Sequence, residues 1–293
     1  MKHLRYILEF LLLLPTLAMF RILSFRPAVW LARRLADIWY VLNIRRRRIS
    51  IANIMACGIT TDRTEASRIA RESFRHVGTL LIESLKSRTL FARPDVAERM
   101  KLCVAPELEK LLKDPGQGII LATGHFGSFE IAAQLLSRGK PVAGVSRGMN
   151  NPYVNKIMLR ERPKDGFYLM PKHDSSDTSR FLRVLKEGHV LALMVDQYAI
   201  DRGMMVEFFG RPASTHSGIA MLHLISGAPL CFGYCIRIGE MRYELHAEGP
   251  FTYKPTGNKE EDVRRVLKEL NGRLEAAIRL APEQYLWAHR RWR

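Results

Sequence analysis

A histidine and a glutamate five residues apart, His125 and Glu130, are the side chains of this sequence whose types and spacing best suit catalysis. The short apolar run 119–122 predicts a buried strand that stops just before Gly124, and an apolar helical pattern begins after Glu130. On one continuous helix, five residues turn through about 500°, so the two side chains would point in different directions. They can meet if His125 lies in a strand-to-helix turn, which Gly124 and Gly127 permit because they lack a Cβ.

Such a pair would act as a general base. One imidazole nitrogen would be held by the carboxylate while the other faces a substrate, and no enzyme nucleophile would be needed. The competing interpretation is an ordinary hydrogen-bonded pair without a catalytic role. Ser128 does not make the motif a serine hydrolase site, because Gly-Ser-Phe-Glu lacks the second glycine of the G-x-S-x-G elbow. Amides at the start of the helix after Gly127 are candidate donors to an oxyanion.

Further polar side chains follow the ends of other predicted strands. Ser146-Arg147 follows one apolar run, Asp196-Gln197 closes another, and Arg211 follows the run 204–209. In open α/β sheets, binding sites gather beyond the carboxyl ends of the strands, so these side chains are candidates for one pocket. Turn caps and surface ion pairs are the structural alternatives for Asp196 and for the arginines, which include Arg160.

The elements that must position these residues alternate along the chain. Periodicity predicts strands at 119–123, 141–146, 190–195, 204–209, 229–238 and 242–247. It predicts helices after Asp62 and at 106–113, 128–138, 151–162, 176–187, 215–226 and 259–280, with Ser214, Thr215 and His216 opening the helix at 215–226. This order favours an α/β fold with a mixed, mostly parallel central sheet flanked by helices.

The N-terminal region differs from the rest of the chain. Residues 6–25 form the most apolar window, although it contains Glu9, Pro15 and Arg21. We interpret residues 1–25 as an uncleaved membrane anchor, which either spans the bilayer with a tilt or lies in the interface. The basic run 45–48 follows it, and the positive-inside bias then predicts a cytoplasmic location for the body of the protein, residues 26–293, whose part up to about residue 115 is helical and basic.

Composition restricts the partners. The 293 residues contain 46 Lys and Arg against 29 Asp and Glu, a formal net charge of +17, which indicates an anionic partner. Aromatic residues fall in apolar runs and do not alternate with basic residues as in a base-stacking groove, so we do not expect nucleic acid. The four cysteines show neither a zinc spacing nor a disulfide framework, and Cys231 and Cys235 fit one buried strand face.

Several stretches together resemble the bacterial lipid A biosynthesis acyltransferase family, which includes lauroyl and myristoyl transferases and belongs to the wider lysophospholipid-acyltransferase-like superfamily. The resemblance covers nearly the whole chain in order. One departure is Ser128-Phe129, where many members carry Asn-Trp. The matching stretches are RRRRISIANIMACG (45–58), GHFGSFE (124–130), SRGMNNPYVNKIMLRER (146–162), LKEGHVLALMVDQ (185–197), VEFFGRPASTHSGIAML (206–222) and PEQYLWAHRRWR (282–293).

The resemblance implies transfer of a fatty acyl chain from acyl carrier protein to a hydroxyl of a phosphorylated, glucosamine-based lipid at the cytoplasmic face of the inner membrane. It implies that His125 is the base and Glu130 its orienting carboxylate. The thioester donor is already activated, so we expect neither a metal nor a cofactor. The residues that the resemblance and the strand ends assign to substrate binding are Arg147, Arg160, Asp196, Gln197 and Arg211. Two alternatives are an acyltransferase acting on a glycerolipid or another glycolipid, and a basic membrane-binding or nucleic-acid-binding protein without activity.

Overall fold

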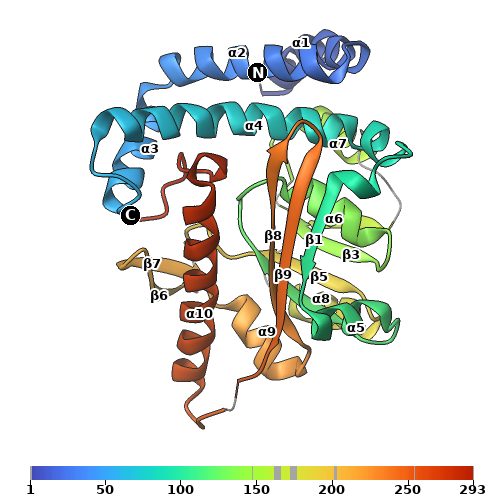
Figure 1. Cartoon of the computed structure of the whole chain (residues 1–293), viewed down its shortest axis with the longest axis vertical. Helices are drawn as coiled ribbons and strands as arrows, with labels where there is room; N and C mark the ends of the chain where they lie inside the picture. Colours follow the sequence, from blue (N-terminus) through green and yellow to red (C-terminus); the bar gives the residue numbers. More distant parts are fainter. Residues whose placement is uncertain are drawn as a thin grey trace.

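A seven-stranded sheet with the strand order β1-β9-β8-β2-β5-β3-β4 forms the centre of the protein (Figure 1). The computed structural model describes residues 2–146, 148–161, 166–171, 177–200, 203–253 and 255–292. Neighbouring strands of the sheet are parallel except β8 and β9. The strands are β1 (Met100–Val104), β2 (Ile119–Thr123), β3 (Val142–Ser146), β4 (Phe167–Pro171), β5 (Val190–Met194), β6 (Gly203–Phe208), β7 (Arg211–His216), β8 (Leu230–Gly239) and β9 (Arg242–Phe251).

Helices cover both faces of this sheet, so the predicted α/β class and its mostly parallel sheet are confirmed. Helices α5 and α6 contact one face, and α8, α9 and α10 contact the other. Because the central strands β2 and β5 are covered on both faces, they are continuous apolar runs and do not alternate with polar residues. The helices are α1 (Lys2–Ile22), α2 (Phe25–Leu42), α3 (Ile44–Ala56), α4 (Arg63–Phe91), α5 (Pro106–Lys113), α6 (Phe129–Ser137), α7 (Pro152–Glu161), α8 (Asp177–Lys186), α9 (Gly218–Ser226) and α10 (Lys259–Leu280).

Two of the long helices, α10 and α4, begin at capping residues that can be recognised in the sequence. Helix α10 is capped by Asn258, whose side chain accepts hydrogen bonds from the amides of Glu260 and Glu261. Its buried residues recur at helical spacing, from Val263 to Ile278, and this stripe packs against the sheet. Helix α4 begins after Asp62, whose side chain accepts a hydrogen bond from the amide of Thr64.

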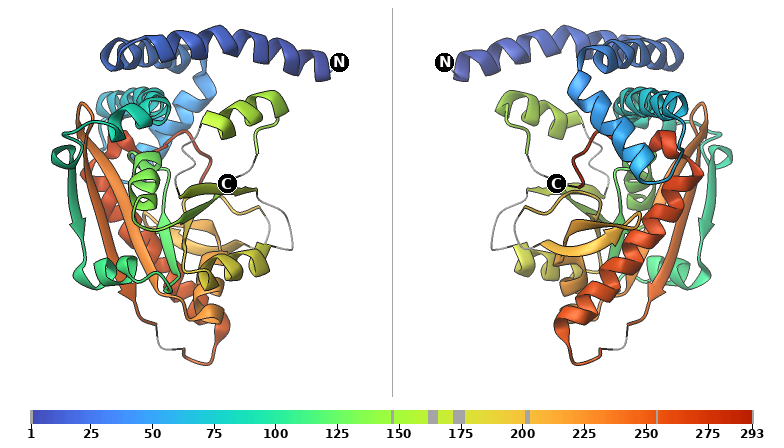
Figure 2. Two further views of the ribbon diagram at one scale, coloured as in Figure 1. Left: turned by 90° about the vertical axis from the view of Figure 1, so that its right-hand side faces the viewer. Right: turned by 90° about the vertical axis from the view of Figure 1, so that its left-hand side faces the viewer.

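The N-terminal helices lie across one end of the molecule. Helix α2 packs along α4, and α1 extends over α7 (Figures 1 and 2). The side chain of Asn151, which precedes α7, donates hydrogen bonds to the carbonyl of Tyr6 and to Glu9. Helix α1 is long and apolar enough to cross a membrane, and it is a candidate membrane anchor.

One predicted element is wrong. Ser214, Thr215 and His216 do not open a helix but belong to β7, which pairs with β6 as an antiparallel hairpin. Phe209 and Gly210 form its turn, both with positive φ (53° and 66°). Two consecutive positive φ angles characterise the tight turns whose twist suits a β-hairpin. Helix α9 therefore begins only at Gly218. Strands β1 and β4, which lie at the two edges of the sheet, were not predicted from the sequence.

Candidate active site

The turn that carries His125 joins β2 to α6 and is tightly fixed. Gly127 has φ +61°, and a Cβ there would lie 2.0 Å from the carbonyl oxygen of Cys235 on β8. The amide of Gly127 donates to Gln284 at 2.9 Å, and the amide of Ser128 donates to Cys235 at 2.6 Å. The chain at this turn therefore fits only with glycine at position 127. Because the two amides are already occupied, any oxyanion donors at this helix must come from its first turn, beginning at Phe129.

Strand register brings His125 to Asp196. Thr123 at the end of β2 is aligned with Met194 at the end of β5, and each functional residue stands two positions further on. Asp196 Oδ1 lies 2.9 Å from His125 Nδ1, and Asp196 Oδ2 accepts a hydrogen bond of 2.8 Å from the His125 amide. Gly124 suits this crowded position, since a Cβ there would lie 2.9 Å from Leu274 Cδ1 on α10 and 3.4 Å from Asp196 Cγ.

The second ring nitrogen of His125 faces a polar neighbour. Gln197 Nε2 lies 3.2 Å from His125 Nε2. With the Nδ1 proton donated to Asp196, Nε2 carries the lone pair and accepts from the Gln197 amide. The phenyl ring of Phe129 meets the imidazole edge to face, with ring centroids 5.7 Å apart. The ring is thus fixed in one orientation, with its basic nitrogen available to a group that displaces Gln197.

Electrostatics favour proton transfer to this histidine. Burial alone lowers the pKa of His125, but the negative charge of Asp196 and its hydrogen bond raise it, and the pKa of His125 lies above its ordinary value. Burial tends to raise the pKa of Asp196, but His125 lowers it overall, so this carboxyl is ionised although only 3% of its side chain is exposed. An imidazole held by a buried carboxylate is a stronger base and a better-oriented one.

The carboxylate on Nδ1 is therefore Asp196, whereas the motif spacing predicts Glu130 at this position. The role of each carboxylate in catalysis stays a prediction. Glu130 lies in the first turn of α6 and lines the same cavity as His125. The reason is the parallel pairing of β2 with β5, which places the side chain that follows β5 directly beside His125. Spacing along one chain segment could not reveal a partner 71 residues away.

Buried polar residues behind the turn support it. Ser128 Oγ donates to Glu83 Oε2 at 2.7 Å, and Glu83 forms an ion pair with Arg237 at 3.2 Å. Arg237 also lies 3.4 Å from His76 Nδ1, and His76 Nε2 lies 3.2 Å from the carbonyl of Gly127. Burial lowers the pKa of His76 to about 3, so it stays neutral. This network, which the sequence did not predict, connects α4 and β8 to the turn that carries His125.

The C-terminal segment 285–292, which we call the tail, closes the other side of the site. The amide of Leu286 donates to the carbonyl of His125 at 3.1 Å. Tyr285 is buried against Asp196; burial first, and then the Asp196 charge, raise the pKa of its hydroxyl. Arg291 is buried and donates to the carbonyls of Gln197 and Ser214 and to Thr215 Oγ1. The tail therefore holds both loops that carry His125 and Asp196.

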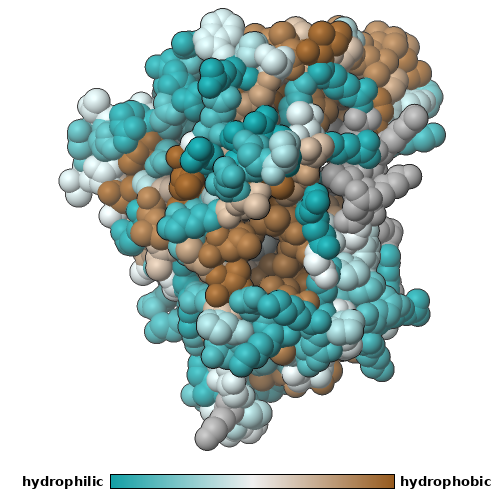
Figure 3. Space-filling model, turned by 45° about the vertical axis from the view of Figure 1, so that its right-hand side comes forward, coloured by the Kyte–Doolittle hydropathy of each residue, from teal (hydrophilic) through white to brown (hydrophobic). Residues whose placement is uncertain are grey.

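An apolar cavity of about 580 Å³ begins at His125. It runs between the sheet and helices α5 and α6, from Thr123 at the carboxyl end of β2 to Ile119 at its amino end. At the strand rise of about 3.3 Å per residue, this path is roughly 13 Å long. Such a hollow, bordered by apolar residues, opens on the side that is turned forward in Figure 3. The volume lies within the range of about 300–1,000 Å³ typical of small-ligand sites.

Comparison with known proteins identifies this arrangement. The sequence profile of the family described as "Bacterial lipid A biosynthesis acyltransferase" matches residues 1–293. The chain belongs to this family. It is 26% identical over 252 residues to the lipid A biosynthesis lauroyltransferase of Escherichia coli (strain K12), covering 85% of this chain and 79% of that protein. It is 25% identical over 254 residues to the lipid A biosynthesis palmitoleoyltransferase of the same strain, with the same coverage.

A third relative, a lipid A biosynthesis acyltransferase of Haemophilus influenzae, is 23% identical over 180 residues, which are 60% of this chain and 54% of that protein. The predicted family is thus confirmed, and the protein is an acyltransferase of lipid A biosynthesis. An apolar cavity that reaches a histidine suits a family whose relatives are named for lauroyl and palmitoleoyl transfer.

The arginines predicted for substrate binding in this acyltransferase lie in different places relative to the cavity and to the described residues. Arg147 lies outside the described residues, and Arg160 belongs to α7 with its side chain outside the described part. Arg211 does not line the cavity; its guanidinium lies over the ring of Trp292, 4.7 Å from the centroid. The reason is again the β6–β7 hairpin, because Arg211 begins β7 directly after the turn and faces the tail.

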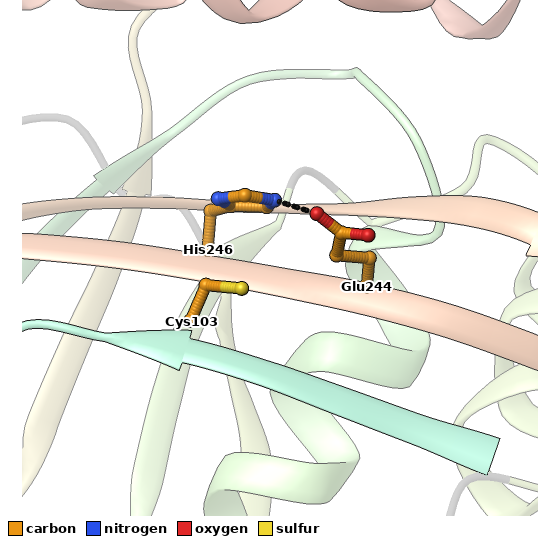
Figure 4. A group of neighbouring side chains, drawn as sticks. All are labelled: Cys103, Glu244 and His246. Carbon is orange, nitrogen blue, oxygen red and sulfur yellow. Dashed lines mark hydrogen bonds and ion pairs between the residues drawn. The ribbon is translucent and has the colours of Figure 1, made fainter.

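Among the described residues, a separate group of three side chains has the composition of a metal site. Cys103 on β1 and Glu244 and His246 on β9 place their ligand atoms within 4.8 Å of one another (Figure 4). Glu244 accepts from His246 at 2.6 Å and from Lys101 at 3.0 Å. These bonds already satisfy both carboxylate oxygens, so the group functions here as a cross-strand contact at the edge of the sheet.

Proposed function

We propose that this protein transfers a fatty acyl chain from acyl carrier protein to a hydroxyl of a phosphorylated, glucosamine-based lipid, a precursor of lipid A. The observation that supports this proposal most directly is the oriented imidazole of His125 at the mouth of a 580 Å³ apolar cavity. The cavity offers room for the acyl chain, and the imidazole offers a base for the hydroxyl.

In the proposed reaction, His125 Nε2 removes the proton of the acceptor hydroxyl as its oxygen attacks the thioester carbonyl. Asp196, 2.9 Å from Nδ1, stabilises the imidazolium that forms. Collapse of the tetrahedral intermediate breaks the carbon–sulfur bond, and the imidazolium returns its proton to the leaving thiolate. The first-turn amides of α6 and the Gln197 amide are the candidate donors to the oxyanion.

The acyl donor and the membrane both suit the strongly basic composition. A net charge of +17 favours an acidic carrier protein and an anionic lipid surface. Apolar side chains on α1 and α2 are exposed, among them Leu12 (74% exposed) and Ile22 (85%). We propose that these helices bind the inner membrane at its cytoplasmic face, where the basic residues that follow meet anionic headgroups.

Two arginines outside the described contacts remain part of the proposal. Arg147 directly follows Ser146, which lines the cavity at the end of β3, and Arg160 lies in α7. We propose that both contact the polar part of a substrate, and that Gln197 contacts the reacting groups.

The experiment that tests this function is acyl transfer by the purified chain, with acyl carrier protein loaded with chains of several lengths and the phosphorylated lipid as acceptor. His125→Ala should reduce turnover by about 100-fold to 10,000-fold, as expected for a lost general base. Mass spectrometry of lipids from a deletion strain identifies the acceptor in the cell. If the deletion strain has unchanged lipid A and an altered glycerolipid or another glycolipid, the acceptor is that other lipid. Near-normal turnover of folded His125→Ala would exclude the mechanism.

A further inference from the structure

A small basic cavity lies beside the tail, apart from the apolar cavity. It has a volume of about 180 Å³ and is lined by Arg45, Arg46, His289 and Arg290. Within the described ranges, none of the three arginines forms an ion pair with a carboxylate. Three guanidinium groups around one cavity repel one another unless an anion lies between them.

The two segments that form this cavity are held together firmly. Arg46 donates to the carbonyl of Ala288 at 2.7 Å, and Asn53 donates to the carbonyls of Trp287 (2.9 Å) and His289 (3.0 Å). Helix α3 is therefore attached to the tail by hydrogen bonds from two of its residues, Arg46 and Asn53. The basic groups keep their positions without an anion, which favours binding because little order must be gained.

His289 adds a group that lacks a partner. Its Nδ1 is buried and has no hydrogen bond to any described residue. Burial lowers the pKa of His289, so its ring is neutral and can donate one hydrogen bond without adding a charge. His289 also lines the cavity, so its ring can supply a neutral hydrogen-bond donor beside the three arginines.

The position of the cavity relates it to both the active site and the membrane. The tail that lines it also donates from Leu286 to His125 and from Arg291 to Gln197. On the other side, the exposed apolar residues of α1 and α2 continue to Leu42 and Ile44, directly before Arg45. When the apolar face rests on a membrane, the cavity lies at the level of the lipid headgroups.

A larger open cavity of about 720 Å³ adjoins the first one and shares Arg45 and Arg290 with it. Its other lining residues include Ile44, Ile49 and Trp292. Apolar and aromatic side chains beside arginines suit an amphipathic molecule, such as a sugar that carries both acyl chains and a phosphate.

We propose that Arg45, Arg46, His289 and Arg290 bind a phosphate monoester of the lipid acceptor and thereby place its hydroxyl at His125. This inference rests on the proposed function. Guanidinium groups grip phosphate through paired hydrogen bonds, which a lysine ammonium does not reproduce. The phosphate contact is present before and during the reaction, so it acts on acceptor binding and leaves the chemical step unchanged.

The test uses Arg45→Gln, Arg290→Gln and the double variant of the full chain, with phosphorylated and enzymatically dephosphorylated acceptor. Each single variant should raise KM for the phosphorylated acceptor about 10-fold to 100-fold and leave kcat near its normal value. KM for the dephosphorylated acceptor should stay within a factor of about two of that of the unmodified protein. Arg47→Gln is the matched control. This substitution removes the same charge from the same helix, but the Arg47 guanidinium lies over the ring of Tyr40 and does not line the cavity.

Further measurements separate the other sources of anionic groups. Vesicles of phosphatidylglycerol without acceptor should bind Arg45→Gln, Arg290→Gln and Arg47→Gln equally; a selective loss with the first two would assign the cavity to bulk headgroups. A raised KM for the acyl carrier protein would assign it to the donor, and equal KM increases on both acceptors would also overturn the inference.

Titration calorimetry measures the affinity of the chain for the phosphorylated acceptor in detergent micelles, and this measurement does not depend on acyl transfer. If the unmodified chain acylates no such lipid, the proposed function fails, and arginine-dependent binding still decides this inference. Turnover with unchanged KM in both variants would sink the inference and leave the function standing.

Discussion

At the residue scale, Asp196 does more for the candidate base than any other side chain. Its two oxygens contact the ring and the backbone amide of the same histidine, at 2.9 and 2.8 Å. The carboxylate thus fixes the tautomer, the ring orientation and the position of the turn together. Its charge also opposes the lowering of the His125 pKa by burial.

Replacing Asp196 with Asn should therefore change the pH dependence of acyl transfer. The base must be neutral to act, and the raised pKa of His125 places the acidic limb of the kcat/KM profile above the ordinary value of 6.5. In Asp196→Asn the lowering effect of burial remains while the charge is lost, so the limb should move to lower pH. The plateau should fall by about 100-fold to 10,000-fold.

Glu130→Gln provides the matched comparison, because it removes a carboxylate from the same cavity without touching Nδ1. Its acidic limb should stay closer to that of the unmodified protein. A profile that shifts with Glu130→Gln and not with Asp196→Asn would return the orienting role to Glu130.

At the scale of elements, the tail behaves as part of the active-site framework. Its strongest attachment is Arg291, a buried guanidinium that donates to two carbonyls and one hydroxyl. Those acceptors belong to the loop after β5 and to β7, which precede Arg291 by 94 residues (Gln197) and by 77 and 76 residues (Ser214 and Thr215). The tail therefore joins the loop that carries Asp196 and Gln197 to the hairpin.

Arg291→Met should lower the free energy of unfolding by roughly 3 kcal/mol, because it leaves several buried acceptors without a donor. Urea denaturation checks this value, and Arg290→Met is the control, since the neighbouring side chain is only half-buried. Equal losses in the two variants would show that the tail contributes through its backbone alone.

Helices α1 and α2 expose apolar side chains. Leu8 and Leu12 are exposed on α1 and contribute to a continuous apolar face. Soluble monomers rarely expose such a face, so a membrane is its expected partner.

Replacing Leu8 and Leu12 with Glu should weaken binding to anionic vesicles at least about tenfold, since it removes apolar burial and adds repulsion. The thermal midpoint should hardly change, because neither side chain is buried. Vesicle sedimentation measures the first effect and calorimetry the second. Undiminished sedimentation would mean that another segment carries the membrane contact.

At the scale of the whole molecule, the sheet determines the shape of the apolar cavity. The carboxyl ends of β2, β3 and β5 meet at His125, and their amino ends meet near Leu112 on α5 and Lys140. The distance along these strands limits the length of an acyl chain that can lie in the cavity.

Leu112→Trp should fill the deep end of the cavity and shift the preferred donor toward shorter acyl chains. Leu111→Trp is the control, because Leu111 lies on the same helix, α5, but does not line the cavity. Relative kcat/KM values across donors of different lengths measure the shift. An unchanged preference, with both variants folded, would place the chain elsewhere.

Local patterns in the sequence were sufficient to predict the class of the fold and a candidate base. Apolar runs at 119–123 and 190–195 predicted β2 and β5 to within one residue, because strands buried on both faces must be apolar throughout. The glycines around His125 predicted the tight turn that carries it, and the order of the motifs identified the family. All of these signals are local, or follow the chain in order.

The contacts between these groups depend on the three-dimensional fold. The register of β2 against β5 brought Asp196 to His125, and the β6–β7 hairpin turned Arg211 away from the cavity. The tail reached the active site from the far end of the sequence, and α3 met it to form the basic cavity. Contacts of this kind depend on strand order and packing, which join residues that no periodicity along the chain relates.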